Sequence, residues 1–369
     1  MSRLQPDLTV RIVSGAPSGS RPVLITGGAG FVATNVAHRL LSGGRRVLLF
    51  DNLSRPGVIE NVRWLRERHG SLVRFQAGDI RDPEVVRLVV EEASHIFHFA
   101  AQVAVTTSLV DPFLDFDTNA RGTLNLLEAV RATEHRPPIL FTSTNKVYGH
   151  LDDIVLRASD TRYEPVDEAL RKQGIGEGRC LEFHSPYGCS KGVAEQYVLD
   201  YARTFGLRTV VFRMSCIYGP HQFGTEDQGW VAHFLIAAMR GQPLTIYGDG
   251  MQVRDILFVE DLVDAMLLAM ANVERLSGEA FNIGGGPGNT TSLVELLELI
   301  EELCGIAPLS ELEAWRTADQ RYYVSDTGKF QRATGWHPSV NVREGVSRLH
   351  DWIVDNLLHE TAAEGRVAS

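Results

Sequence analysis

The 369-residue sequence has few cysteines and no long apolar run. Its four cysteines, Cys180, Cys189, Cys216 and Cys304, are too sparse for a disulfide framework and lack the spacing of a metal site, which favours reduced thiols. No apolar stretch reaches the roughly 20 residues that cross a bilayer, and the first residues lack a signal-peptide pattern. We therefore expect a cytoplasmic protein with no metal and no membrane partner, and a flexible leader at residues 1–20.

Positive charge is also scarce. The formal net charge is −10, and the lysines and arginines are scattered rather than arranged in a stripe. Nucleic acids bind to clustered cations, so no nucleic-acid partner is expected. An anionic ligand would need cations gathered locally in its site.

Short apolar runs rich in β-branched residues alternate with helical patterns. The runs cover residues 23–26, 47–51, 73–77, 95–100, 139–144 and 209–213, and helices are expected over 33–41 and 117–133. This alternation is typical of a parallel sheet with helices on both faces. We predict an α/β fold, with a Rossmann-type doubly wound parallel sheet over 21–218 and a smaller C-terminal α/β lobe, mainly substrate-binding, over 219–369. Segments near 251–270 are candidates for a return to the larger domain.

A glycine-rich turn joins the first expected strand to the first expected helix. Gly27, Gly28 and Gly30 let the backbone approach a pyrophosphate, and the helix N-terminus behind them offers free N–H groups. Asp51 ends the second strand, where a carboxylate accepts both ribose hydroxyls and repels a 2′-phosphate. We predict NAD rather than NADP as the cofactor, although the neighbouring Arg55 is a cation that could accept a phosphate.

Tyr187 and Lys191 stand four residues apart behind Ser185, a suitable helix N-cap, and Pro186, a suitable first helical residue. They therefore share one helix face, one turn apart. A cation near a phenol favours the phenolate, so we predict that Lys191 lowers the pKa of Tyr187 and that Tyr187 takes a proton from a sugar hydroxyl. An amphipathic helix with a solvated lysine is the alternative interpretation of this pair alone.

These motifs together resemble those of the extended short-chain dehydrogenase/reductase family. The likeness includes the strand that ends at Thr144, and it implies that Thr144 hydrogen-bonds the reacting oxygen, that Tyr187 is the acid and base, and that Lys191 binds the nicotinamide ribose. Asp79 and Ile80 suit the adenine ring, with a simple turn carboxylate as the alternative for Asp79. The cofactor-binding residues expected from the motifs and the likeness are Gly27, Gly30, Phe31, Val32, Asp51, Asn52, Ser54, Arg55, Asp79, Ile80, Ala100, Ala101, Gln102, Asn119, Thr142, Ser143, Tyr187, Lys191 and Met214.

Within this family, the chain resembles epimerases that act at C2 of CDP-linked deoxyhexoses. The similar segments are 50–55, 102–108, 143–149, 183–192 and 227–231. The likeness implies that bound NAD oxidises the C2 hydroxyl to a 2-keto sugar and returns the hydride to the opposite face. The alternatives are an epimerase for a UDP- or GDP-hexose, at C4 or another carbon, and a dinucleotide-binding sensor without turnover.

The likeness also implies a set of substrate-binding residues, among them arginines for the diphosphate. Cys216 stands where related epimerases often have an asparagine that contacts the substrate, and Met251 stands where a lysine is common. The expected set is Val103, Thr106, Thr144, Asn145, Cys216, Gln222, Arg254 and Arg321.

Two further features of the sequence bear on the reaction and the assembly. Asn145 and Lys146 follow Thr144 and cannot supply the carboxyl pair that dehydration needs, so a dehydratase is disfavoured. The segment 150–184 is too long for a plain connection, which makes it a candidate lid over the sugar, with a surface excursion as the alternative. The family likeness implies a homodimer, or a tetramer, built through helices near 117–133 and 186–204.

Overall fold

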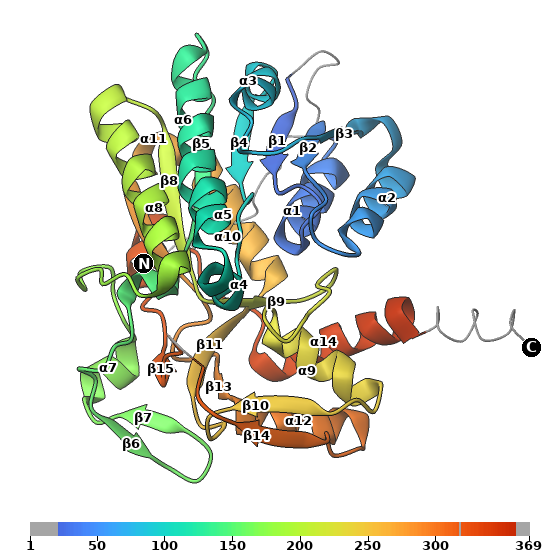
Figure 1. Ribbon diagram of the computed structural model, residues 1–369, viewed down its shortest axis with the longest axis vertical. Coiled ribbons are helices and arrows are strands. Elements are labelled where there is room, and N and C mark those ends of the chain that lie inside the picture. The colour runs from blue at the N-terminus through green and yellow to red at the C-terminus, as the bar shows by residue number, and fades with distance from the viewer. Residues whose placement is uncertain (1–20, 317–318, 359–369) are drawn as a thin grey trace, which may run out of the picture.

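Residues 21–316 and 319–358 are described by a computed structural model, so the leader expected at 1–20 lies outside the described chain. The described residues form a large unit around a central sheet and a smaller lobe beyond one end of its strands (Figure 1). Among them, no helix combines the length and the apolarity that are required to cross a membrane.

A seven-stranded sheet in the order β12-β8-β5-β4-β1-β2-β3 forms the centre of the large unit. Every neighbouring pair of strands in it is parallel. The chain builds outward from β1 to β3, then crosses back and builds outward through β4 on the other side, so the predicted doubly wound sheet is confirmed. The strands are β1 (Val23–Thr26), β2 (Val47–Asp51), β3 (Val73–Ala77), β4 (His95–His98), β5 (Ile139–Thr144), β8 (Thr209–Met214) and β12 (Glu279–Ile283).

Helices cover both faces of this sheet and bury its apolar side chains in two clusters. One face is covered by α3 (Pro83–Glu91), α6 (Gly122–Ala132) and α8 (Ser185–Phe205), and the other by α1 (Phe31–Ser42), α2 (Val58–His69), α10 (Val259–Ala271), α11 (Val273–Leu276) and α13 (Gly328–Thr334). Shorter elements are η1 (Gly70–Leu72), α4 (Val105–Val110), α5 (Pro112–Phe116), η2 (Asp117–Arg121) and η3 (Asn145–Tyr148). The helix expected over 117–133 is thus divided into η2 and α6.

The smaller lobe has its own apolar core around Phe234, Leu296 and Leu349. Its helix α12 (Leu293–Cys304) begins with a capping box formed by Ser292 and Glu295, and it ends at Gly305, which has a left-handed backbone. The lobe contains β9 (Cys216–Tyr218), α9 (Trp230–Met239), β10 (Leu244–Tyr247), β11 (Val253–Phe258), β13 (Thr290–Ser292), α12 (Leu293–Cys304), β14 (Ser310–Glu313), β15 (Tyr322–Tyr323), α14 (Val342–Ile353) and η4 (Val354–Leu358).

The chain crosses between the two units more than once, so residue 219 divides them only roughly. Strand β9 ends before residue 219 but pairs with β11 of the lobe. In the opposite direction, α10 packs on α1 and β12 pairs with β8 of the large sheet. The return to the larger unit therefore extends beyond the expected 251–270 segment and includes residues 279–283.

A buried carboxylate ties α8 to the strands beneath it. Glu195 on α8 is fully buried, accepts hydrogen bonds from Arg213 Nε at 3.0 Å and Nη2 at 2.6 Å, and accepts another from Ser143 Oγ at 2.6 Å. Arg213 lies on β8 and Ser143 on β5, so one side chain joins three elements. The remaining guanidinium donor reaches the Tyr148 hydroxyl at 2.9 Å.

We predict that Glu195→Ala lowers the free energy of unfolding by about 3–5 kcal/mol, because it leaves the Arg213 guanidinium buried without its partner. Chemical denaturation measures this change. The matched control is Glu60→Ala on α2, which breaks an exposed pair with Arg63 and should cost no more than about 0.5 kcal/mol. Equal effects of the two substitutions would contradict the role given to Glu195.

Candidate active site

The glycine-rich turn after β1 is packed too closely for side chains. Gly27 has a φ of 66°, and a Cβ on it would lie 2.8 Å from the backbone nitrogen of Ala100. A Cβ on Gly28 would lie 2.8 Å from Leu49 Cβ. The turn therefore presents bare backbone at the N-terminus of α1, as the sequence predicted.

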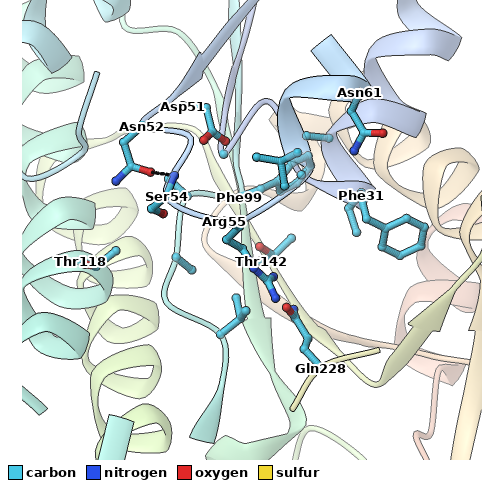
Figure 2. A pocket seen from close by; sticks show the side chains of 18 of the residues that line it. Phe31, Asp51, Asn52, Ser54, Arg55, Asn61, Phe99, Thr118, Thr142 and Gln228 are labelled. Carbon is cyan, nitrogen blue, oxygen red and sulfur yellow. Dashed lines mark hydrogen bonds between the residues drawn. The ribbon is translucent and has the colours of Figure 1, made fainter. Parts of the chain in front are cut away.

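This turn forms one wall of a cavity of about 430 Å³ at the carboxyl ends of the strands. Figure 2 shows Asp51, Asn52 and Ser54 together on one side of the cavity, with Thr142 and Gln228 farther along it. The residues expected to bind the cofactor that line it are Gly27, Gly30, Phe31, Val32, Asp51, Asn52, Ser54, Arg55, Ile80, Ala100, Ala101, Thr142, Ser143, Tyr187, Lys191 and Met214.

Backbone hydrogen bonds hold the Asp51 carboxylate in place at the end of β2. Its Oδ2 accepts the Ala29 N–H at 3.1 Å, and its Oδ1 accepts the Leu53 N–H at 2.7 Å. Burial raises the pKa of Asp51, while these two hydrogen bonds and nearby Arg55 oppose the shift. The carboxylate thus lies beside the glycine-rich turn, where the sequence placed a ribose contact.

Three residues expected to bind the cofactor do not line this cavity, and each has a contact within the described chain. Asp79 forms an ion pair with Arg81 at 2.7 Å. Such a contact agrees with the alternative given for Asp79, a simple carboxylate in a turn. Gln102 donates to Asp115 at 2.8 Å. Asn119 is 1 % exposed and donates to Ser190 on α8 at 3.0 Å, which joins η2 to the helix that carries Tyr187 and Lys191.

Several lining residues were not predicted from the sequence. Asn61 on α2 donates to the Ala29 carbonyl at 3.0 Å, beneath the glycine-rich turn. Some of the others lie in segments whose pattern was recognised although the residue was not singled out, and the remainder lie in loops, above all the loop after β9; they are Ala33, Phe50, Pro56, Val58, Gly78, Phe99, Thr118, His221, Phe223, Gly224, Thr225 and Gln228.

A second cavity, of about 570 Å³, lies between the strand ends and the smaller lobe. Tyr187 lines both cavities, so the two meet at its side chain. Of the expected substrate-binding residues, Val103, Thr106, Thr144, Asn145, Cys216, Gln222 and Arg254 line the second cavity. Residues lining it that the sequence did not single out as substrate contacts include Lys146, Glu226, Asp227, Trp230, Tyr247, Gln252, Arg316 and Asp319.

Thr144, Tyr187 and Lys191 come together as their spacing predicted. Helix α8 begins at Ser185, whose Oγ accepts the Gly188 N–H at 3.3 Å. Thr144 at the end of β5 hydrogen-bonds the Tyr187 phenol, and Lys191 Nζ donates to the Thr142 carbonyl at 2.6 Å. All three catalytic candidates are buried.

The predicted lowering of the Tyr187 pKa by Lys191 is wrong for this structure. Burial raises the pKa of Tyr187 to about 12, and the hydrogen bond with Thr144 only partly offsets that rise. Burial also lowers the pKa of Lys191 to about 7, although Glu195 and Asp115 oppose this shift. Desolvation disfavours both the ammonium and the phenolate, so burial opposes the predicted charge pair.

Comparison with known proteins agrees with this geometry. Residues 23–284 match the model of the NAD dependent epimerase/dehydratase family. The chain belongs to this family. It is 47% identical over 339 residues to CDP-paratose 2-epimerase of Salmonella typhi, covering 89% of this chain and 98% of the relative. It is 30% identical over 335 residues to a putative UDP-glucose 4-epimerase of Methanocaldococcus jannaschii, covering 90% and 99%.

A solved structure of a family member contains the cofactor. The UDP-glucose 4-epimerase of Thermus thermophilus, in complex with NAD, superimposes with a TM-score of 0.76 at 32% identity and covers 91% of this chain and 100% of its own. NAD is therefore the cofactor of this epimerase-family enzyme, and the first cavity fits it. The bare turn at Gly27 admits a pyrophosphate, Asp51 can accept the ribose hydroxyls, and Lys191 and Tyr187 line the same cavity.

The cations of the second cavity differ from those expected in this family member. Arg321 does not line the cavity and lies against the rings of Tyr163 and Trp315. Arg316, which was not singled out from the sequence, lines the cavity, and the phosphate contact predicted for Arg321 stays a prediction. The family likeness pointed to Arg321, and Arg316 precedes it in the same irregular segment.

Arg254 and Lys146 share the carboxylate of Asp319 at this cavity. Arg254 Nη2 lies 2.8 Å and Lys146 Nζ 3.6 Å from Asp319 Oδ1. Burial lowers the pKa of Lys146. Two cations and one carboxylate leave an excess of one positive charge, which suits an anionic ligand.

The two residues that depart from the family pattern, Cys216 and Met251, differ in whether they line the second cavity. Cys216 lines the second cavity, where its Sγ accepts the Trp230 Nε1–H at 3.4 Å, and burial raises the pKa of its thiol. A neutral thiol thus replaces an amide that both donates and accepts. Met251 does not line either cavity, so its substitution leaves the described lining unchanged.

The segment 150–184 folds as β6 (Leu156–Ala158), β7 (Tyr163–Pro165) and α7 (Glu168–Gln173). None of its described residues lines either cavity. It packs on the smaller lobe, where Arg162 pairs with Glu295 and the Tyr163 hydroxyl donates to Asp249. The structure therefore favours the surface excursion over the lid.

We predict that Lys191→Met removes a pH dependence of stability from the NAD-free enzyme. The pKa of Lys191 falls from 10.5 to about 7 on folding, so between these values the unfolded chain binds a proton that the folded chain does not. The unfolding free energy of the wild type should therefore rise with pH across this window relative to the variant, by up to about 5 kcal/mol at about 1.4 kcal/mol per pKa unit. Denaturant titrations at several pH values measure the difference. A constant difference would contradict the lowered pKa.

Proposed function

We propose that this enzyme is a sugar-nucleotide epimerase of the CDP-paratose/CDP-tyvelose type, which inverts C2 of a CDP-linked deoxyhexose. The observation that carries the proposal is the meeting of the two cavities at Tyr187, which places one acid/base group between a dinucleotide site and a separate ligand site. The 47% identity to a CDP-paratose 2-epimerase supports the sugar and the base.

The chain's own residues supply the proton chemistry. Thr144 and Tyr187 would hold the C2 hydroxyl, with Tyr187 taking its proton as the C–H hydride leaves. Bound NAD would accept this hydride and later return it, and the positive charge of its nicotinamide ring would favour the phenolate that burial alone disfavours. Lys191, held by the Thr142 carbonyl, would orient the nicotinamide ribose.

Inversion requires the 2-keto sugar to present its other face to the same hydride. The second cavity has room for this, since it measures about 570 Å³ and its lining is divided between the strand ends and the lobe. Lys146 and Arg254 would hold the diphosphate while the sugar turns. Asn145 and Lys146 beside Thr144 provide no carboxyl pair for dehydration, which supports epimerisation over the other activity of the family.

A panel of CDP-, UDP- and dTDP-sugars with NMR of the products tests the proposal. We expect inversion at C2 of a CDP-linked deoxyhexose. Tyr187→Phe should lower turnover by roughly 10²–10⁴-fold while NAD remains bound, because only the proton-transferring hydroxyl is lost. Inversion of a UDP-sugar at C4, or full activity of the variant, would contradict the assignment.

We also propose that the enzyme is a homodimer through the face formed by α4, α5 and α8. Val110 and Phe113 are 86% and 84% exposed, and Leu109, Phe116 and Tyr197 are exposed beside them on the same helices. Adjoining apolar side chains exposed to this extent are typical of an interface. The proposed face includes α8, which was named from the family likeness, whereas α4 and α5 precede the helix expected over 117–133.

We predict that Phe113→Glu converts the dimer to a monomer, because a symmetric interface loses the burial of two phenyl rings, worth about 1.5–3 kcal/mol each, and gains two charges. Size-exclusion chromatography with light scattering measures the mass. The control Leu312→Glu alters a residue of β14 that is 68% exposed and should leave the mass unchanged. A monomeric wild type would refute the interface, and a four-chain mass would require a second one.

A further inference from the structure

The buried carboxylate of Asp115 contacts neutral groups among the described residues. Asp115 lies on α5 and is fully buried. Its Oδ1 accepts hydrogen bonds from Gln102 Nε2 at 2.8 Å and from Asn119 Nδ2 at 3.2 Å, and both donors are uncharged amides. Its Oδ2 accepts no hydrogen bond, and none of the ion pairs in the described part of the chain includes this carboxylate. A charge is therefore buried here without a cation in contact with it, which is costly.

Lys191 on α8 is the opposite case, a buried cation without a carboxylate in contact with it. Its Nζ donates to the Thr142 carbonyl at 2.6 Å and lies 4.3 Å from the centre of the Phe141 ring. Neither contact carries a full negative charge, and no carboxylate of the described residues lies within ion-pair distance of the amine. Since burial lowers the pKa of Lys191 to about 7, the ammonium needs a negative charge nearby in order to persist.

Two carboxylates oppose this effect of burial, and they differ in what else they bind. Glu195 is the larger influence, but it forms an ion pair with Arg213 at 2.6 Å, and that pair is neutral as a whole. Asp115 is the other influence and has no such partner. The effect is mutual, because burial raises the pKa of Asp115 and the charge of Lys191 is among the influences that oppose the rise. Asp115 thus carries the negative charge that is left to balance Lys191.

A polar chain joins Asp115 to the turn of α8 between Tyr187 and Lys191. Asn119 Nδ2, which donates to Asp115, also lies 3.0 Å from Ser190 Oγ, and Ser190 Oγ donates to the Tyr187 carbonyl at 3.2 Å. The charge of Asp115 acts on both ends of this turn. Besides burial, it raises the pKa of Tyr187, and it raises that of Lys191 against the effect of burial.

Hydrogen bonding alone does not explain an aspartate at this position. An asparagine has nearly the same shape, and its carbonyl oxygen would accept from Gln102 and Asn119 without burying a charge. The charge itself therefore has to be accounted for. A carboxylate that is close to Lys191 but not bonded to it favours the ammonium and leaves the Nζ donors free for a ligand, whereas a direct ion pair would occupy them.

We propose that Asp115 is a positioning residue that acts through Lys191, as the counter-charge that keeps this buried amine an ammonium and leaves it available to the nicotinamide ribose. The inference rests on the proposed function, which assigns the ribose to Lys191 and the proton transfer to Tyr187. It adds a fourth residue to the three at the reaction centre, one that touches neither substrate nor cofactor.

The other ionisable groups around this pair are neutral or paired. His98 on β4 is buried, and burial, together with the charge of Lys191, lowers its pKa to about 3, so it is uncharged near neutral pH. On η2, Asp117 and Arg121 lie 3.6 Å apart as an ion pair. Helix α4, which also packs on α5, has no ionisable side chain. These groups therefore leave the balance between Asp115 and Lys191 unchanged near neutral pH.

The pH dependence of kcat/KM of the NAD-bound enzyme with a CDP-linked deoxyhexose tests the proposal. In the proposed mechanism, the rate rises with pH as Tyr187 ionises and falls as Lys191 loses its proton. Removal of a negative charge lowers both pKa values, so Asp115→Asn should move both limbs of the profile to lower pH, by about half a unit or more. The control Ser190→Ala breaks the same polar chain without changing a charge, and it should lower the rate with both limbs in place.

A second measurement reads Lys191 directly and needs no turnover. The chain contains four lysines, so NMR of the NAD-bound enzyme labelled with ¹³C at lysine Cε gives few signals, and Lys191→Met assigns the one from Lys191. We expect the titration midpoint of this signal to be about half a unit or more lower in Asp115→Asn than in the wild type, and unchanged in Ser190→Ala. If Asp115→Asn does not fold, Asp115→Ser removes the same charge and should give a shift of the same sign.

The outcomes separate this inference from the proposed function. A lowered Lys191 midpoint in the variant without the charge supports the inference even if no CDP-sugar is turned over, in which case the proposed activity fails. An unchanged or raised midpoint, or an equal shift in Ser190→Ala, overturns the inference even if a CDP-sugar is epimerised.

Discussion

The catalytic geometry depends on the buried carboxylate of Glu195. It joins α8, which carries Tyr187 and Lys191, to Ser143 on β5 and Arg213 on β8. Since Thr144 follows Ser143 directly, this one side chain sets how far the phenol lies from the hydroxyl at the strand end. A buried ion pair adds little net stability compared with apolar packing, but it imposes a defined register on the elements that it joins. Hydride transfer is sensitive to small errors in the positions of the reacting groups. The ion pair of Glu195 with Arg213 therefore suits the proposed chemistry, because it fixes α8 relative to the strands.

The division of the site into two cavities follows from the topology of the chain. Parallel strands bring their carboxyl ends to one edge, and the winding reverses between β1 and β4, which opens space for a dinucleotide there. After β8 the chain leaves the large sheet for β9, and the loop that follows returns past this edge before α9 begins. Gln222 and Gln228 of that loop line both cavities. One connection thus closes the cofactor site and builds the wall of the substrate site.

Local patterns in the sequence predicted the features that depend on neighbouring residues. The glycine-rich turn and the pairing of Tyr187 with Lys191 on α8 each follow from spacing within one short segment. Features set by contacts between distant segments were missed. Strand β12 joins the large sheet although it is distant in sequence, and Arg316 rather than Arg321 faces the substrate cavity. The pKa of Tyr187 depends on burial, which spacing does not encode.

One group of side chains offers an anion a local site in the second cavity, although the lining as a whole contains three cations and three carboxylates. Arg254 and Lys146 share one carboxylate, so the group carries a single excess positive charge despite the formal net charge of −10. In a desolvated site, a single charge interacts far more strongly than one at the surface. Burial lowers the pKa of Lys146, and an incoming diphosphate would reverse that shift by favouring the ammonium. Ligand binding would therefore be coupled to proton uptake at Lys146, and the same desolvation that disfavours the free cation would strengthen its pairing with the phosphate.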